Sequence, residues 1–162
     1  MEIQPIIDAI YQSNVSTAIR DTSWVVPVVQ SIHIVAIATL VGSMLVTDLR
    51  LAGVFAVDEA PRIVAMRYMR WVWAALVVLL VTGAVMAIGE PDRVLNNWIF
   101  WLKMGLVLCA TALSSLFRLP LLRPDLDESN AWWSRADAPF AWISLAIWVC
   151  VIFCGRWIAY AL

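Results

Sequence analysis

Long stretches without charged residues constrain this chain more than any other feature. Thr22 to Thr47 contains 26 residues without Asp, Glu, Lys or Arg, Trp71 to Gly89 contains 19, and Ala138 to Gly155 contains 18. A fourth stretch, Trp98 to Phe117, contains 20 residues and is broken only by Lys103. A helix of about 20 apolar residues crosses the roughly 30 Å hydrocarbon core of a bilayer. We therefore predict membrane-spanning helices at about 24–47, 69–89, 98–117 and 138–160.

The composition excludes other classes of protein. Apolar residues make up 63% of the 162 residues and charged residues 14%, against about 45–50% and about 25% in soluble domains. A net charge of −1 offers no basic surface for nucleic acid. We predict an all-α integral membrane four-helix bundle over residues 24–162. Residues 1–23 form a separate amphipathic segment, which we expect to lie as short helices on the membrane interface.

The distribution of Lys and Arg predicts the orientation in the membrane. Seven arginines flank the connections after the first and third spans: Arg50, Arg62, Arg67, Arg70, Arg118, Arg123 and Arg135. Four cations lie towards the opposite side: Arg20, Arg93, Lys103 and Arg156. Short loops rich in Lys and Arg stay in the cytoplasm. We therefore predict a multi-pass protein of the bacterial inner membrane with both termini outside.

Four polar side chains fall within the predicted spans, in the outer half of the membrane. They are His33, which is the single histidine, Gln30, Lys103 and Arg156. Gln30 precedes His33 by three residues and so shares its helix face. Charged and ionisable groups at this depth are costly and commonly mark functional sites. Their common depth predicts one polar site.

His33 has two interpretations. A neutral imidazole in a helix bundle can form a hydrogen bond to a backbone carbonyl or to Gln30 and serve packing alone. Alternatively, its Nε2 atom is an axial ligand of haem b, with the small residues Ala36, Ala38 and Gly42 leaving room for the macrocycle. In the second case the metal ligand is His33, and Gln30 tunes or orients the site.

Lys103 and Arg156 also have two interpretations. Each can extend to the outer headgroups, or each can bind a haem propionate. One histidine per chain leaves three ligation states open. The iron is five-coordinate, or His33 pairs with its copy across a homodimer, or a methionine such as Met86 or Met104 supplies the sixth ligand.

Two further functions stay open from the residues. The three cysteines, Cys109, Cys150 and Cys154, all lie in predicted spans and most simply act as small apolar residues. With nearby methionines they would suit copper(I). Alternatively, the chain is a structural or accessory subunit of a larger membrane complex, packed through small-residue contacts such as Gly83 with Ala87 and Gly105 with Cys109.

The first and last spans resemble a known type of protein. The stretch from Ser31 and His33 to Gly53, and the ending from Gly155 to Tyr160, resemble small uncharacterised bacterial four-helix membrane proteins. More distantly, the positions of His33, Arg50 and 101–103 are similar to CopD-like proteins and to HemJ-type protoporphyrinogen oxidases.

The HemJ-type resemblance implies haem b bound at His33, with basic residues serving porphyrin carboxylates. HemJ-type proteins carry a further histidine late in the lysine-bearing helix, where this chain has Ser114 and Ser115. The resemblance therefore implies haem binding rather than porphyrinogen oxidation. We expect electron transfer or an oxidoreductase step, with a quinone, a porphyrin or a periplasmic redox protein as partner. The CopD-like resemblance implies copper handling as the alternative.

Overall fold

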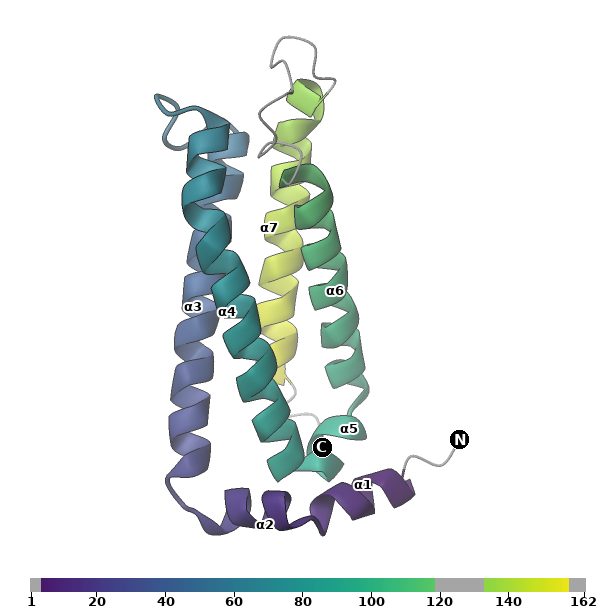
Figure 1. Cartoon of the computed structure of the whole chain (residues 1–162). Helices are drawn as coiled ribbons and strands as arrows, with labels where there is room; N and C mark the ends of the chain where they lie inside the picture. The colour runs from purple at the N-terminus through teal and green to yellow at the C-terminus, as the bar shows by residue number, and fades with distance from the viewer. Residues whose placement is uncertain (1–3, 119–132, 158–162) are drawn as a thin grey trace.

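The computed structural model describes residues 4–118 and 133–157, and the regular structure within them is entirely helical. Four helices are long and three are short (Figure 1). In chain order the helices are α1 (Gln4–Tyr11), α2 (Asn14–Asp21), α3 (Val25–Leu51), α4 (Pro61–Gly89), α5 (Pro91–Leu95), α6 (Trp98–Arg118) and α7 (Trp133–Trp157).

The four long helices confirm the predicted all-α four-helix architecture. Each of them is long and apolar enough to cross a membrane. Three extend further than their uncharged runs, because a helix continues through the headgroup region where hydropathy has already fallen. Thus α3 ends at Leu51 rather than 47, α4 starts at Pro61 rather than 69, and α7 starts at Trp133 rather than 138. The predicted end of the last span, 158–160, lies outside the described residues.

The core of the bundle is a cluster of apolar side chains from all four long helices. Its buried members are Leu40, Met44, Met69, Val72, Ala75, Ala110, Trp148 and Val151. The close helix pairs of the bundle are α3 with α4, α6 with α7, and α3 with α7. Trp148 is 2% exposed and lies in this cluster.

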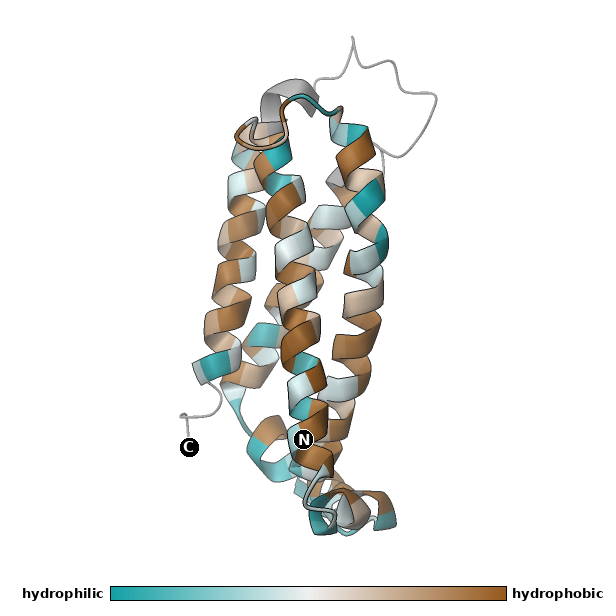
Figure 2. Ribbon diagram, turned by 90° about the vertical axis from the view of Figure 1, so that its left-hand side faces the viewer, coloured by the Kyte–Doolittle hydropathy of each residue, from teal (hydrophilic) through white to brown (hydrophobic). Residues whose placement is uncertain are grey.

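Apolar side chains also cover the outside of the bundle. Val35 is 65% exposed, Leu80 69% and Phe153 65%, and Figure 2 shows hydrophobic residues along the whole length of the long helices. Helices that are apolar on every side are suited to a lipid environment. The chain is therefore a multi-pass membrane protein whose outer surface contacts the bilayer.

The two ends of the bundle differ. At one end, here named the capped end, α1, α2 and α5 lie across the ends of the long helices (Figure 1). Ser16 of α2 is fully buried there and donates a hydrogen bond of 2.7 Å to the carbonyl of Ile88. A Cβ atom on Gly89 would lie 3.1 Å from Ile19 Cγ2, so α2 packs closely against the end of α4.

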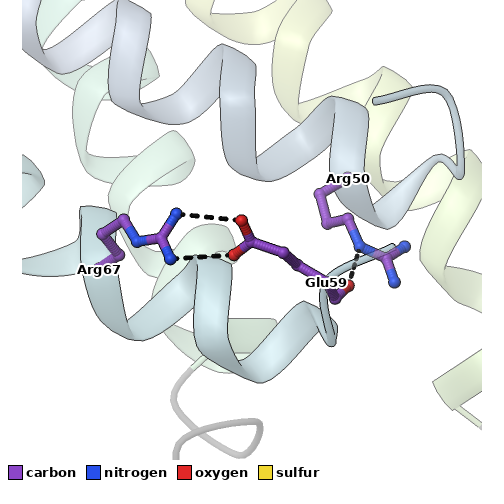
Figure 3. A network of polar contacts seen from close by, with 3 residues as sticks. All are labelled: Arg50, Glu59 and Arg67. Atoms are coloured by element: carbon purple, nitrogen blue, oxygen red, sulfur yellow. Dashed lines mark hydrogen bonds and ion pairs between the residues drawn. The ribbon is translucent and has the colours of Figure 1, made fainter. Parts of the chain in front are cut away.

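At the opposite end, here named the loop end, residues 52–60 connect α3 to α4. Arg50 donates a hydrogen bond of 2.6 Å from Nε to the carbonyl of Glu59. The carboxylate of Glu59 pairs with Arg67 at 3.0 Å. Figure 3 shows how Glu59 lies between the two arginines. These contacts fix the connection between the two helices.

Candidate functional site

The candidate site lies between α3 and α4, close to the capped end. His33 is eight residues from the start of α3, and Thr82 is seven residues from the end of α4. At 1.5 Å per residue, both lie about 10–12 Å from the helix ends. Since α3 and α4 are antiparallel neighbours, the two side chains meet: His33 Nδ1 is 2.6 Å from Thr82 Oγ1.

The hydrogen bonds of Thr82 assign the tautomer of His33. Thr82 Oγ1 lies 2.7 Å from the carbonyl oxygen of Val78 in its own helix, to which it donates. A threonine hydroxyl has one hydrogen but can also accept. The arrangement that satisfies both short contacts therefore has Nδ1–H of His33 donating to Thr82. The Nε2 atom then keeps its lone pair, which is the form of neutral imidazole that binds metals.

Gly83 and Lys103 complete the surroundings of the imidazole. A Cβ atom on Gly83 would lie 3.7 Å from His33 Cε1, so the ring packs beside the backbone of α4. On α6, Lys103 is a half-buried cation within electrostatic range of His33. The ammonium rests against α7, where a Cβ atom on Gly155 would lie 3.2 Å from Lys103 Nζ. We name His33, Thr82, Gly83 and Lys103 the His33 site.

The other two predicted site residues lie at the surface. Gln30 is exposed on α3, and among the described residues it forms no hydrogen bond with His33. Arg156 is exposed beside Gly155, the residue that Lys103 touches. Lys103 therefore lies within electrostatic range of His33, whereas Gln30 and Arg156 are exposed.

Two residues named by the resemblance have structural contacts elsewhere. Arg50 is 17 residues from His33 along the same helix and holds the 52–60 connection at the loop end. Trp101 Nε1 donates a hydrogen bond of 3.0 Å to the carbonyl of Leu95 at the capped end. Of the other resembling positions, Lys103 rests against Gly155 of α7, within electrostatic range of His33.

The cysteines are free thiols. Cys109 and Cys150 are exposed, and Cys154 is half-buried within electrostatic range of Lys103. Within residues 4–118 and 133–157 there is no group of three or more His, Cys, Asp or Glu side chains that could hold a metal ion. The described donor set thus offers an isolated imidazole rather than a multidentate protein site.

Two shallow apolar hollows lie outside the His33 site. One, of about 460 Å³, lies between α2 and the start of α3 and includes Ile19 and Trp24. The other, of about 400 Å³, lies on the outer surface of α3 and α4 and includes Val35 and Trp71. Neither is lined by His33, so neither takes part in the site described above.

Thr82 is a site residue that the sequence-based prediction does not include. One signal was available, because Thr82 is the only hydroxyl side chain in the uncharged run Trp71 to Gly89. Its depth from the capped end also equals that of His33. A single hydroxyl at that depth in an otherwise apolar span is a candidate partner for a polar side chain on a neighbouring helix.

Comparison with known proteins places the chain in a family. Residues 21–161 match a family described as a family of unknown function, DUF6644. The match begins at the last residue of α2, so α1 and nearly all of α2 precede it. No curated protein and no solved structure matches the chain. Because the match covers both His33 and Lys103 and all four long helices, the chain belongs to the DUF6644 family.

Proposed function

We propose that the protein binds haem b in the bilayer, with His33 Nε2 as the axial ligand of the iron. The observation that carries this proposal is the hydrogen bond between His33 Nδ1 and Thr82 Oγ1. The hydroxyl of Thr82 donates its own hydrogen to the carbonyl of Val78. A hydrogen bond at one ring nitrogen fixes the ring and raises the basicity of the other. Thr82 would thus hold His33 in the ligating tautomer.

The available donors suit haem better than a bare metal ion. A structural zinc site needs about four protein ligands, whereas a porphyrin supplies four nitrogens and needs one axial ligand from the protein. The described residues provide a single imidazole and no cluster of three ligands. Bound haem would supply one-electron redox chemistry.

The two cations of the predicted site, Lys103 and Arg156, suit the carboxylates of a porphyrin. Lys103 is half-buried, reaches Gly155 near the end of α7 and lies within electrostatic range of His33. We propose that it binds one propionate, and that Arg156 at the exposed end of the same helix binds the other. Gln30, one turn from His33 towards the capped end, would contribute a polar group at the rim of the site.

The sixth position of the iron has two candidates within the chain. Met86 lies one turn from Thr82 on α4, and Met104 follows Lys103 on α6; both are half-buried. With both termini outside the bacterial inner membrane, the His33 site lies in the outer half of the bilayer. We propose electron transfer with a periplasmic or quinone partner there, or an oxidoreductase step on a quinone or porphyrin.

The optical spectrum tests this function. The protein purified in mild detergent from haem-replete cells is expected to show a Soret band. His33→Ala should lose the band because the axial ligand is gone. Cys150→Ala is the matched control and should keep it, since Cys150 is exposed on α7.

Three other results would contradict the proposal. A colourless wild-type preparation would show that the protein binds no haem. Stoichiometric copper that depends on the cysteines would support the copper-handling alternative. A colourless, copper-free protein that migrates in a larger complex on native gels would support an accessory membrane subunit.

A further inference from the structure

Three buried polar atoms on α6 and α7 have no hydrogen-bond partner among the described residues. They are Ser114 Oγ on α6, and Ser144 Oγ and Trp148 Nε1 on α7. Ser114 is 3% exposed, Ser144 1% and Trp148 2%. Ser144 and Trp148 are four residues apart, so they share one face of α7.

Several other hydroxyl groups in the spans are satisfied by their own helix. Ser31 donates to the carbonyl of Pro27, Thr39 to Val35 and Thr47 to Ser43, each four residues earlier in the same helix. This is the usual way in which serine and threonine satisfy a hydroxyl group in a membrane helix. Ser114 and Ser144 do not form this bond, so their hydroxyls are available to a partner that is not their own helix.

The two serines lie at one level of the bundle. Ala110, Trp148 and Met44 meet in the apolar core cluster. One turn closer to the loop end, α6 presents Ser114 and α7 presents Ser144, because these two helices run antiparallel. On α3, Asp48 lies one turn from Met44 towards the loop end and is fully buried. A polar layer therefore lies directly on the loop-end side of the apolar cluster.

The chemistry of this layer points to water. A buried hydroxyl that forms no hydrogen bond is unfavourable, and a lipid environment offers it no solvent. Each serine has one hydrogen to donate and two lone pairs to accept with. Water matches both functions, and buried water commonly bridges such groups. A carboxyl group in the same layer adds further acceptors.

We propose that Ser114, Ser144 and Asp48 line a water-filled inlet that opens to the loop end and stops at the apolar core cluster. The inlet brings water, and the protons that it carries, within one turn of Trp148. The cluster separates this water from the His33 site near the capped end. The inlet does not depend on the cofactor, so the two proposals are tested independently of each other.

Cysteine accessibility tests the inlet. The background protein has Cys109, Cys150 and Cys154 replaced by alanine. Ser114→Cys and Ser144→Cys are nearly isosteric substitutions, and each thiol is exposed to aqueous Ag⁺ in reconstituted membranes. After quenching, the free thiol that remains is measured by mass spectrometry.

Two reference variants calibrate the rates. Phe55→Cys, in the exposed connection between α3 and α4, gives the rate of a fully accessible thiol. Ala110 is 1% exposed and lies in the apolar cluster, one turn from Ser114. Ala110→Cys therefore gives the reaction rate of a thiol that water does not reach. We expect Ser114→Cys and Ser144→Cys to react at least about tenfold faster than Ala110→Cys, because water reaches only the serine level. Equal rates for the three variants would overturn the proposal.

Thermal unfolding gives an independent result if a cysteine variant fails to fold. In a dry interior, Ser114→Ala and Ser144→Ala would remove an unsatisfied polar group and raise the midpoint. In a hydrated inlet the substitution removes hydrogen bonds to water, and the midpoint stays at or below that of the wild type. A higher midpoint for both variants would contradict the inlet. A colourless protein with fast-reacting cysteines would overturn the haem proposal alone.

Discussion

A single hydroxyl hydrogen sets the chemical form of His33. Because Thr82 donates it to Val78 at 2.7 Å, the hydroxyl oxygen accepts from His33 Nδ1 at 2.6 Å. The imidazole then presents Nε2 as a lone-pair donor. The role of Thr82 is therefore one of positioning, since it would act on the proposed haem only through His33.

Two substitutions at Thr82 separate its hydroxyl from its shape. Thr82→Val is nearly isosteric and removes the acceptor, so we expect haem affinity to fall by about 10- to 100-fold, as for other partners of a ligating histidine. Thr82→Ser keeps the hydroxyl and should restore most of the affinity. Titration of the haem-depleted protein, followed at the Soret band, measures both. Equal affinities for Thr82→Val and the wild type would show that the hydrogen bond does not matter for binding.

The sequence identifies His33 but not its partner. A single histidine in an uncharged run is visible without a structure. The contact with Thr82 joins residues that are 49 positions apart, and it depends on the register between α3 and α4. That register follows from packing of side chains along the whole helix pair, which no local pattern encodes.

At the scale of elements, the short helices of the capped end are held by a few specific contacts. Arg20 donates to Ser16 Oγ at 2.6 Å and to the carbonyl of Tyr11 at 2.9 Å, and its guanidinium lies 3.8 Å from the centre of the Tyr11 ring. Ser16 in turn donates to Ile88 on α4. Ser16 thus links the surface arginine to the spanning helix.

Removing this link should loosen α2 without changing the His33 site. We expect Ser16→Ala to destabilise the docking of α2 by about 0.5–1.5 kcal/mol, the usual net contribution of a hydrogen bond. Hydrogen–deuterium exchange of residues 14–21 measures the change. Thr17→Ala is the matched control, because Thr17 is exposed and its hydroxyl bonds only within the turn, to the carbonyl of Ser13. Equal exchange in the two variants would contradict a special role for Ser16.

Element boundaries were only partly predictable. The prediction of four spans is confirmed, but the start of α4 at Pro61 was missed by eight residues. The segment before residue 69 carries Arg62 and Arg67, which end the apolar run without ending the helix. Proline is well suited to the first turn of a helix, and this signal marks the boundary better than hydropathy does.

At the scale of the whole molecule, uncharged runs predict how many helices cross the bilayer but not which faces meet. Val35 and Ala36 are adjacent apolar residues on α3, yet Val35 is 65% exposed and Ala36 5%. In lipid, the face of a helix that packs against other helices and the face that contacts lipid are both apolar. The sequence therefore does not distinguish buried from exposed positions. The order of packing, with α3 against both α4 and α7, therefore had to come from the structure.

The central claim is that the bundle holds haem through His33, and a cavity variant tests it most directly. His33→Gly removes the imidazole and leaves space beside Gly83, which packs against the ring. Purified without additions, this variant is expected to lack the Soret band. Purified with free imidazole and haem, it is expected to regain the band with about one haem per chain, because the ligand is restored without its tether. A Soret band in His33→Gly without imidazole, equal to that of the wild type, would contradict the account.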